Sequence, residues 1–185
     1  VSPQNSINEI QIAPLVGAHR TVGCITTISA GMYEPAHITR TGSVSQSLQK
    51  EPICFTVGEL NGEITERVQI IADLFTPAGK TLVTDDLWGQ RWSKMVTNCM
   101  VNATAGMTGL LSHEVRADKE TRNQILNLAI ETVKVGRALG YNVKPPMSEF
   151  SLKDMERVAG PEGNEELDKV LQGNPPEVPG RSSLA

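Results

Sequence analysis

The sequence lacks any long hydrophobic segment. None of its apolar runs approaches the roughly 20 residues that a helix needs to cross a bilayer. Its first ten residues, VSPQNSINEI, contain neither a basic start nor an apolar stretch, so we expect no signal peptide in this segment. We therefore expect a cytoplasmic protein that has no membrane as a partner.

Positive charge, paired cysteines and clustered histidines are also scarce. The net charge is −4 and no stripe of lysine and arginine is present, so the sequence does not predict a nucleic-acid partner. The cysteines and histidines are widely separated, at Cys24, Cys54 and Cys99 and at His19, His37 and His113. This spacing is typical of a reducing cytosol and fits neither a disulfide scaffold nor a zinc site. We expect no bound metal.

Two features expected of a complete nucleotide-binding enzyme are missing. No Gly-x-Gly-x-x-Gly follows a predicted strand, so the dinucleotide-binding fingerprint is absent. The chain also opens on Val1 without an initiator methionine and closes on Ala185 in what resembles continuing sequence. We therefore expect the 185 residues to be a fragment of a longer protein.

Two parts of different character meet near residue 85. In the first, β-branched runs separated by Gly, Ser and Pro predict strands within 21–29, 36–41, 52–60 and 80–84, with helices at 8–15 and along an apolar repeat of Ile64, Val68, Ile71 and Leu74. In the second, helices are expected from Leu87 to Thr108 with a break near Gly106 and Gly109, from Asp118 to Gly140, and at 151–158 and 164–171. The predicted fold class is α/β followed by all-α, with domains at 1–84 and 85–185.

The segment WSKMVTNCMVNATAGMTG, residues 92–109, contains the main candidate site. Lys94, Asn98 and Asn102 fall within an arc of about 80° along roughly 12 Å of helix, and apolar residues occupy much of the remaining circumference. Such a narrow polar stripe suits the lining of a cleft. The alternative is structural: the lysine extends to water and the amides satisfy neighbouring backbone groups.

Other polar residues have weaker signals. Gln4-Asn5-Ser6 follows a probable strand end, where open α/β sheets bind ligands, although Asn5 or Ser6 could instead cap a helix. The Asp85-Asp86 pair favours helix capping. The charged run from Arg116 to Arg122 is interpreted as solvated surface, and the Ser182-Ser183 segment as a solvated loop.

Taken in chain order, these segments resemble the ketopantoate reductase (2-dehydropantoate 2-reductase) family. Gln4-Asn5 resembles the family's Gln-Asn-Gly turn, with Ser6 in place of the glycine. The stretch Leu87-Trp88 followed by Trp92-Ser93-Lys94-Met95, Asn98 and Asn102 resembles its Leu-Trp-x-Lys-Leu-x-x-Asn-x-x-x-Asn motif. Ser182-Ser183-Leu184 resembles the start of its Ser-x-x-x-Gln-Asp segment. The resemblance covers essentially the whole chain.

The resemblance implies an architecture and a set of roles. Residues 1–84 would be the end of a Rossmann-like NADP-binding domain, and residues 85–185 a helical substrate and dimerisation domain like that of 6-phosphogluconate dehydrogenase. Lys94 would be the general acid, Asn98, Asn102 and Ser183 would bind the substrate, and Asn5 would lie near the cofactor, NADPH. A hydride added to a ketone creates an alkoxide, which an ammonium in a cleft can stabilise and protonate.

The leading hypothesis is therefore NADPH-dependent reduction of a 2-oxo acid, 2-dehydropantoate to pantoate in the pathway to pantothenate and coenzyme A, by the parent protein. We expect the 185-residue fragment itself to be inactive, because the phosphate-binding loop is not in it. Two alternatives stay open: another 2-oxo acid substrate, or a non-catalytic helical dimerisation or binding module. A homodimer is a candidate assembly, since uncovered apolar surface favours self-association.

Overall fold

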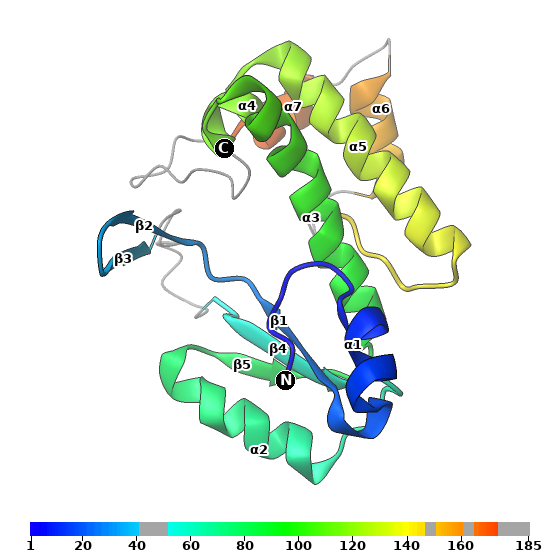
Figure 1. Ribbon diagram of the computed structural model, residues 1–185. Coiled ribbons are helices and arrows are strands. Elements are labelled where there is room, and N and C mark those ends of the chain that lie inside the picture. The colour runs from blue at the N-terminus through cyan, green and yellow to red at the C-terminus, as the bar shows by residue number, and fades with distance from the viewer. Residues whose placement is uncertain (41–51, 147–150, 161–164, 174–185) are drawn as a thin grey trace.

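The computed structural model describes residues 1–40, 52–146, 151–160 and 165–173, and these divide into a sheet region and a helical region (Figure 1). The sheet region holds a three-stranded sheet in the order β1-β4-β5. Its strands are β1 (Val22–Thr26), β4 (Phe55–Glu59) and β5 (Thr81–Val83), with β1 antiparallel and β5 parallel to β4. Ser2 adds a parallel bridge to Gly23, so the N-terminal segment lies along the outer edge of β1.

Two helices accompany this sheet. Helix α1 (Glu9–Val16) follows the N-terminal segment, and α2 (Glu66–Phe75) packs against β4 and β5. Thr65 caps α2, because its hydroxyl accepts a hydrogen bond from the backbone N–H of Val68. The 3₁₀ turns η1 (Ala18–Arg20) and η2 (Thr76–Ala78) lead into β1 and β5.

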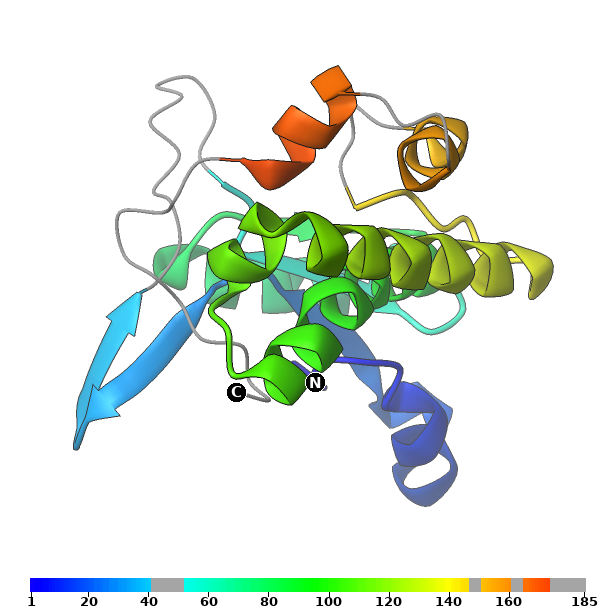
Figure 2. The same cartoon turned by 90° about the horizontal axis from the view of Figure 1, so that it is seen from above.

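A separate hairpin projects to one side of the molecule, away from the three-stranded sheet (Figure 1). It consists of β2 (Ala30–Glu34) and β3 (His37–Arg40), joined at Pro35 and Ala36 (Figures 1 and 2). Strand β3 was expected and β2 was not. The sequence of β2, AGMYE, is short and contains a glycine, so it has neither a β-branched run nor a clear alternation.

The helical region is built on two long helices that lie side by side. Helix α3 (Leu87–Thr108) is followed by α4 (Ser112–Ala117), and α5 (Lys119–Ala138) runs back along α3 (Figure 1). Helices α6 (Leu152–Ala159) and α7 (Glu165–Gln172) pack against α5 and α4. A Cβ at Gly136 would lie 2.5 Å from Val143, so a glycine permits the close packing of α5 on the segment that follows it.

The described chain contains two apolar cores. The larger joins the helices and includes Trp92, Val96, Leu126 and Val133, and the smaller joins the sheet to α2. The smaller core consists of Val22, Cys24, Val57 and Val68. Of the described helices, none combines the length and apolar character that a bilayer span requires.

The expected fold class is confirmed: a small α/β part precedes an all-helical part. Two local features differ from what the sequence pattern indicated, and one helix was not predicted. Ile64 and Leu74 are exposed, because α2 turns Val68 and Ala72 towards the sheet instead. Helix α3 continues through Gly106 and ends only at Gly109, which has the left-handed conformation of a C-terminal cap. Helix α4 was not predicted, since six residues are too few to establish a periodicity.

Candidate active site

A cleft of about 550 Å³ lies between α3, α4, the N-terminal turn and the segment that leads into the hairpin. It is lined by Asn5, by Ile28, Ser29, Ala30, Gly31 and Tyr33, by Lys94, Thr97, Asn98, Val101 and Asn102 of α3, and by Ser112 and Arg116 of α4. Four of the five predicted site residues therefore line one cavity. Ser183, the fifth, lies outside the described residues.

Helix α3 is fixed at its first turn. The Asp86 carboxylate accepts a hydrogen bond of 3.0 Å from the backbone N–H of Gly89, as expected of a helix cap. The indole N–H of Trp88 donates to the carbonyl of Leu60 at 2.9 Å, which ties the helix to the end of β4. A Cβ at Gly23 would lie 2.5 Å from Leu87, so glycine in β1 allows the helix to approach the sheet closely.

The rotation of α3 is set by its apolar side. Trp92, Val96 and Met100 are buried in the helical core, and Trp92 stacks on Tyr141 with ring centroids 5.5 Å apart. Lys94, Asn98 and Asn102 each follow one of these buried residues by two positions, which is more than half a helical turn. Burial of the apolar stripe therefore directs them towards the cleft. Lys94, Asn98 and Asn102 share one wall of the cleft, and each of them is half-buried.

Lys94 is partly buried, and burial lowers the pKa of its ammonium below the ordinary value for lysine. Among the described residues it forms no salt bridge that would offset this desolvation. A lysine of lowered pKa releases its proton more easily than one in water. The site therefore combines a proton donor with amide groups that can orient a polar ligand.

The N-terminal turn reaches the cleft through Asn5. The N-cap of α1 is Asn8, which donates from its side-chain amide to the carbonyl of Asn5 at 2.9 Å, so the capping alternative for Asn5 or Ser6 is wrong. Ser6 has φ 73°, in the left-handed region that glycine prefers. The turn therefore keeps a glycine-type backbone although a serine occupies the position.

A buried ion pair holds this turn against α3. The guanidinium of Arg91 contacts the carboxylate of Glu9 and donates to the carbonyls of Ser2, at 2.8 Å, and of Gln4. Its side chain is 2% exposed and that of Glu9 is 0% exposed, so removing either partner would leave a charge in the interior. Arg91 precedes Lys94 by three residues on the same helix, and it therefore couples the position of Asn5 to that of Lys94.

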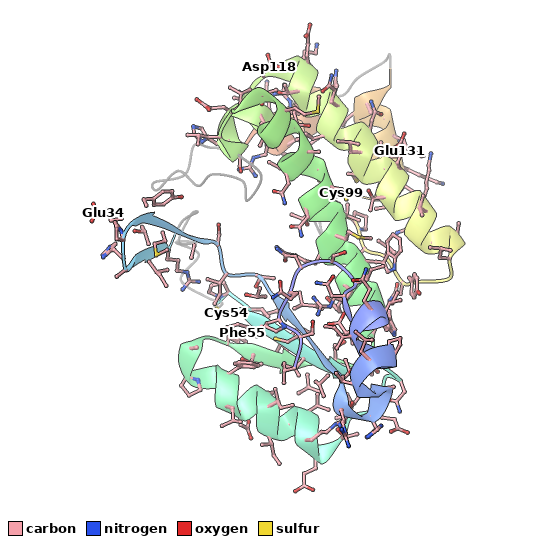
Figure 3. All side chains as sticks on the ribbon, in the orientation of Figure 1. Glu34, Cys54, Phe55, Cys99, Asp118 and Glu131 are labelled. Carbon is pink, nitrogen blue, oxygen red and sulfur yellow. The ribbon has the colours of Figure 1, made fainter. Side chains whose placement is uncertain are left out.

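Sequence reasoning missed Arg116 and Ser112. The charged run from Arg116 to Arg122 was interpreted as solvated surface. In the structure Arg116 lines the cleft, and Arg122 is only 4% exposed. Asp118 is exposed and caps α5 through the N–H of Thr121 at 2.9 Å, at the junction of α4 and α5 labelled in Figure 3. The four-residue spacing of Ser112 and Arg116 puts both on one face of α4, but this signal has meaning only once that helix is known, and α4 was not predicted.

The family described as "Ketopantoate reductase PanE/ApbA C terminal" matches residues 86–182, more than half of the chain. The chain belongs to this family. The match begins at the cap of α3 and covers Lys94, Asn98, Asn102 and Arg116. The resemblance seen in the Lys/Asn/Asn motif is therefore confirmed at the level of the family.

Three known proteins are similar to this chain in sequence or in structure. A 2-dehydropantoate 2-reductase from Mesorhizobium japonicum is 27% identical over 126 residues, which are 68% of this chain and 36% of that protein. The solved 2-dehydropantoate 2-reductase from Geobacter metallireducens has a TM-score of 0.66 at 22% identity, over 94% of this chain and 56% of that one. A D-mandelate dehydrogenase solved with NADH has a TM-score of 0.62 at 17% identity, over 85% of this chain and 50% of that one. The chain thus spans between one third and just over half of these relatives, and the structural likenesses show a shared fold.

Proposed function

We propose that the protein containing this chain reduces a 2-oxo acid with NADPH, converting 2-dehydropantoate to pantoate. The observation that carries this proposal is the placement of Lys94, Asn98 and Asn102 on one wall of a cleft, in a chain of the ketopantoate reductase family. We also propose the domain division at 1–84 and 85–185, which the separate sheet and helical cores support.

NADPH would supply the hydride. Among the described residues, Asn5 and the left-handed turn at Ser6 suit the nicotinamide end of the cofactor. The sequence contains no Gly-x-Gly-x-x-Gly loop that would bind the cofactor's phosphates. The 185 residues would therefore provide the substrate side of the site and the nicotinamide edge. We expect the 185 residues by themselves not to catalyse the reduction.

Lys94 would act on the carbonyl oxygen of the substrate. As the carbonyl carbon is reduced, negative charge grows on that oxygen, and the nearby ammonium both stabilises the charge and transfers its proton. The amides of Asn98 and Asn102 would bind the hydroxyl end of 2-dehydropantoate and orient it. Burial of Lys94 supports this role, because it lowers the pKa of the ammonium towards the working pH.

The proposal predicts the kinetics of a Lys94→Ala variant. In the full gene product that contains these residues, kcat should fall by roughly 10²- to 10⁴-fold, as expected for loss of a general acid. NADPH oxidation with 2-dehydropantoate, followed by absorbance, measures it. Lys153→Ala is the matched control, because Lys153 is exposed on α6 and absent from the cleft lining, and it should leave the rate unchanged.

Two outcomes would contradict the proposal. Unchanged turnover of Lys94→Ala would remove the general-acid role. Absence of NADPH oxidation by the unsubstituted full gene product, with 2-dehydropantoate and other 2-oxo acids, would remove the function itself and favour a binding module.

A further inference from the structure

The guanidinium of Arg116 is the second cation of the cleft. Arg116 lies on the last turn of α4 and lines the same cavity as Lys94, Asn98 and Asn102. Its Nε atom is buried and has no hydrogen-bond partner among the described residues. The salt bridges of the described chain do not include it either. An arginine at a cavity wall with a buried donor that has no partner has a hydrogen bond to offer to a ligand.

The backbone that carries Arg116 is held in place by α5. The guanidinium of Arg122 donates to the carbonyls of Arg116, at 2.6 Å, and Ala117, at 2.8 Å, and the hydroxyl of Thr121 donates to that of Val115 at 2.5 Å. The last carbonyls of α4 are therefore bound by side chains of the next helix.

Helix α7 holds Arg122 in turn. Arg122 forms a bidentate salt bridge with Asp168, in which the two N–O distances are 2.6 and 2.7 Å. Three helices thus fix the position of Arg116, which is the preorganisation that a binding residue needs.

A second cavity shares part of its lining with the cleft, including Arg116. It has a volume of about 290 Å³ and is lined mainly by apolar residues, among them Met100, Ile125 and Leu126. Thr97, Val101 and Arg116 line both cavities. Apart from Arg116, Arg122 and Thr97, the lining of this second cavity is apolar or glycine, so an anion paired with Arg116 beside it would be attracted more strongly than in water.

We infer that Arg116 binds the carboxylate of the 2-oxo acid substrate, and this inference rests on the proposed function. A guanidinium matches a carboxylate with two parallel N–H···O bonds. Every 2-oxo acid carries a carboxylate beside the ketone, and Lys94 has to stay free to protonate the ketone oxygen. With the carboxylate held by Arg116, the ammonium of Lys94 is left for the carbonyl oxygen. One cation thus serves each of the two adjacent groups of the 2-oxo acid, Arg116 the carboxylate and Lys94 the ketone.

The experiment compares two substrates and three arginine variants in the full gene product. The substrates are a 2-oxo acid and its primary 2-oxo amide, which keeps the ketone and loses the charge. The unsubstituted protein should prefer the acid. Arg116→Gln should raise KM for the acid by roughly 10- to 100-fold, the loss expected for a charged two-pronged contact, and change KM for the amide little. Arg116→Lys should recover part of the preference for the acid, because lysine restores the positive charge but cannot form the bidentate contact.

The matched control is Arg157→Gln, since Arg157 is exposed on α6 and absent from both cavities. It should keep the full preference for the acid. If Arg116 had only a structural role, Arg116→Gln would raise KM for the acid and for the amide by the same factor. The ratio of the two KM values therefore separates a binding role from a folding role. An Arg116→Gln protein that still prefers the acid as strongly as the unsubstituted protein overturns the inference while leaving the reductase function intact.

Equilibrium binding decides the inference independently of turnover. Calorimetric titration with the 2-hydroxy acid product and with its amide should show tighter binding of the acid, and Arg116→Gln should abolish that difference. Lys94→Ala should keep it, because Lys94 acts at the other oxygen. If the unsubstituted protein binds the acid no better than the amide, the inference is wrong whether or not the protein reduces 2-oxo acids.

Discussion

Lys94 illustrates how a single residue can contribute to chemistry at the expense of folding. Burial lowers the pKa of its ammonium, so the folded chain binds this proton less tightly than the unfolded chain does. The resulting penalty is present at pH values below the folded pKa and disappears as the pH rises to the ordinary lysine value of about 10.4. A residue kept at a destabilising position is typical of a functional site.

This sign predicts that Lys94→Met stabilises the chain while it removes activity. At neutral pH the free energy of unfolding of the 185-residue chain should increase by about 0.5–2 kcal/mol, because an apolar side chain replaces a desolvated charge. Urea unfolding measures it. The exposed Lys153→Met is the control and should stay within about 0.5 kcal/mol. A less stable Lys94→Met chain would show that the ammonium is well solvated in the cleft.

The hairpin β2–β3 carries a local strain at the level of the element. Ala36 follows Pro35 in its turn and has φ 62°, a conformation that costs a residue with a Cβ roughly 1–2 kcal/mol. Ala36→Gly should therefore stabilise the hairpin by about 0.5–1 kcal/mol, after the greater freedom of glycine in the unfolded chain is subtracted. Hydrogen exchange of the paired amides in β2 and β3 should slow several-fold.

The same substitution within a strand gives the control for the hairpin. Ala30 lies in β2 and is paired with Arg40, and it does not have a positive φ. Ala30→Gly should speed exchange in the hairpin, since glycine weakens a strand interior. Equal effects at positions 30 and 36 would mean that the turn conformation does not limit the stability of the hairpin.

Elements were predictable where the signal is local. Asp86 and Asp118 cap α3 and α5 as expected, because a cap depends on residues three apart in the sequence. The contact between Glu9 and Arg91 was not predictable, since it joins residues 82 positions apart and no local pattern marks either one as buried. Arg116 was missed for a related reason. Whether a charged segment is solvent-exposed or lines a cleft depends on which helices pack around it, and the local sequence does not indicate this.

At the scale of the whole molecule, each of the two cores has an arginine–carboxylate pair at its border. Glu59 accepts hydrogen bonds from Arg67 beside the sheet, and Asp168 accepts them from Arg122 between α5 and α7. These hydrogen bonds lower the pKa of both carboxyl groups. Because the unfolded chain then binds protons more readily, both pairs contribute stability above the ordinary carboxyl pKa of about 4 and lose it as the pH falls through the lowered values.

These two contributions should add when the chain unfolds as one unit, because the two ion pairs share no partner. Asp168→Asn and Glu59→Gln should each lower the free energy of unfolding at neutral pH by about 1–3 kcal/mol, and each should flatten its dependence on acid pH. In the double variant the losses should sum to within about 0.5 kcal/mol, as expected for distant sites without shared partners. Urea unfolding of the single and double variants between neutral and acid pH measures this.

The contrary result would be a double variant that is as stable as the less stable of the two single variants. It would mean that one core unfolds first and alone determines the transition. In that case residues 1–84 and 85–185 would behave as independent folding units, whereas additive losses require the sheet and the helices to unfold together through the contacts that α3 makes with β1 and β4.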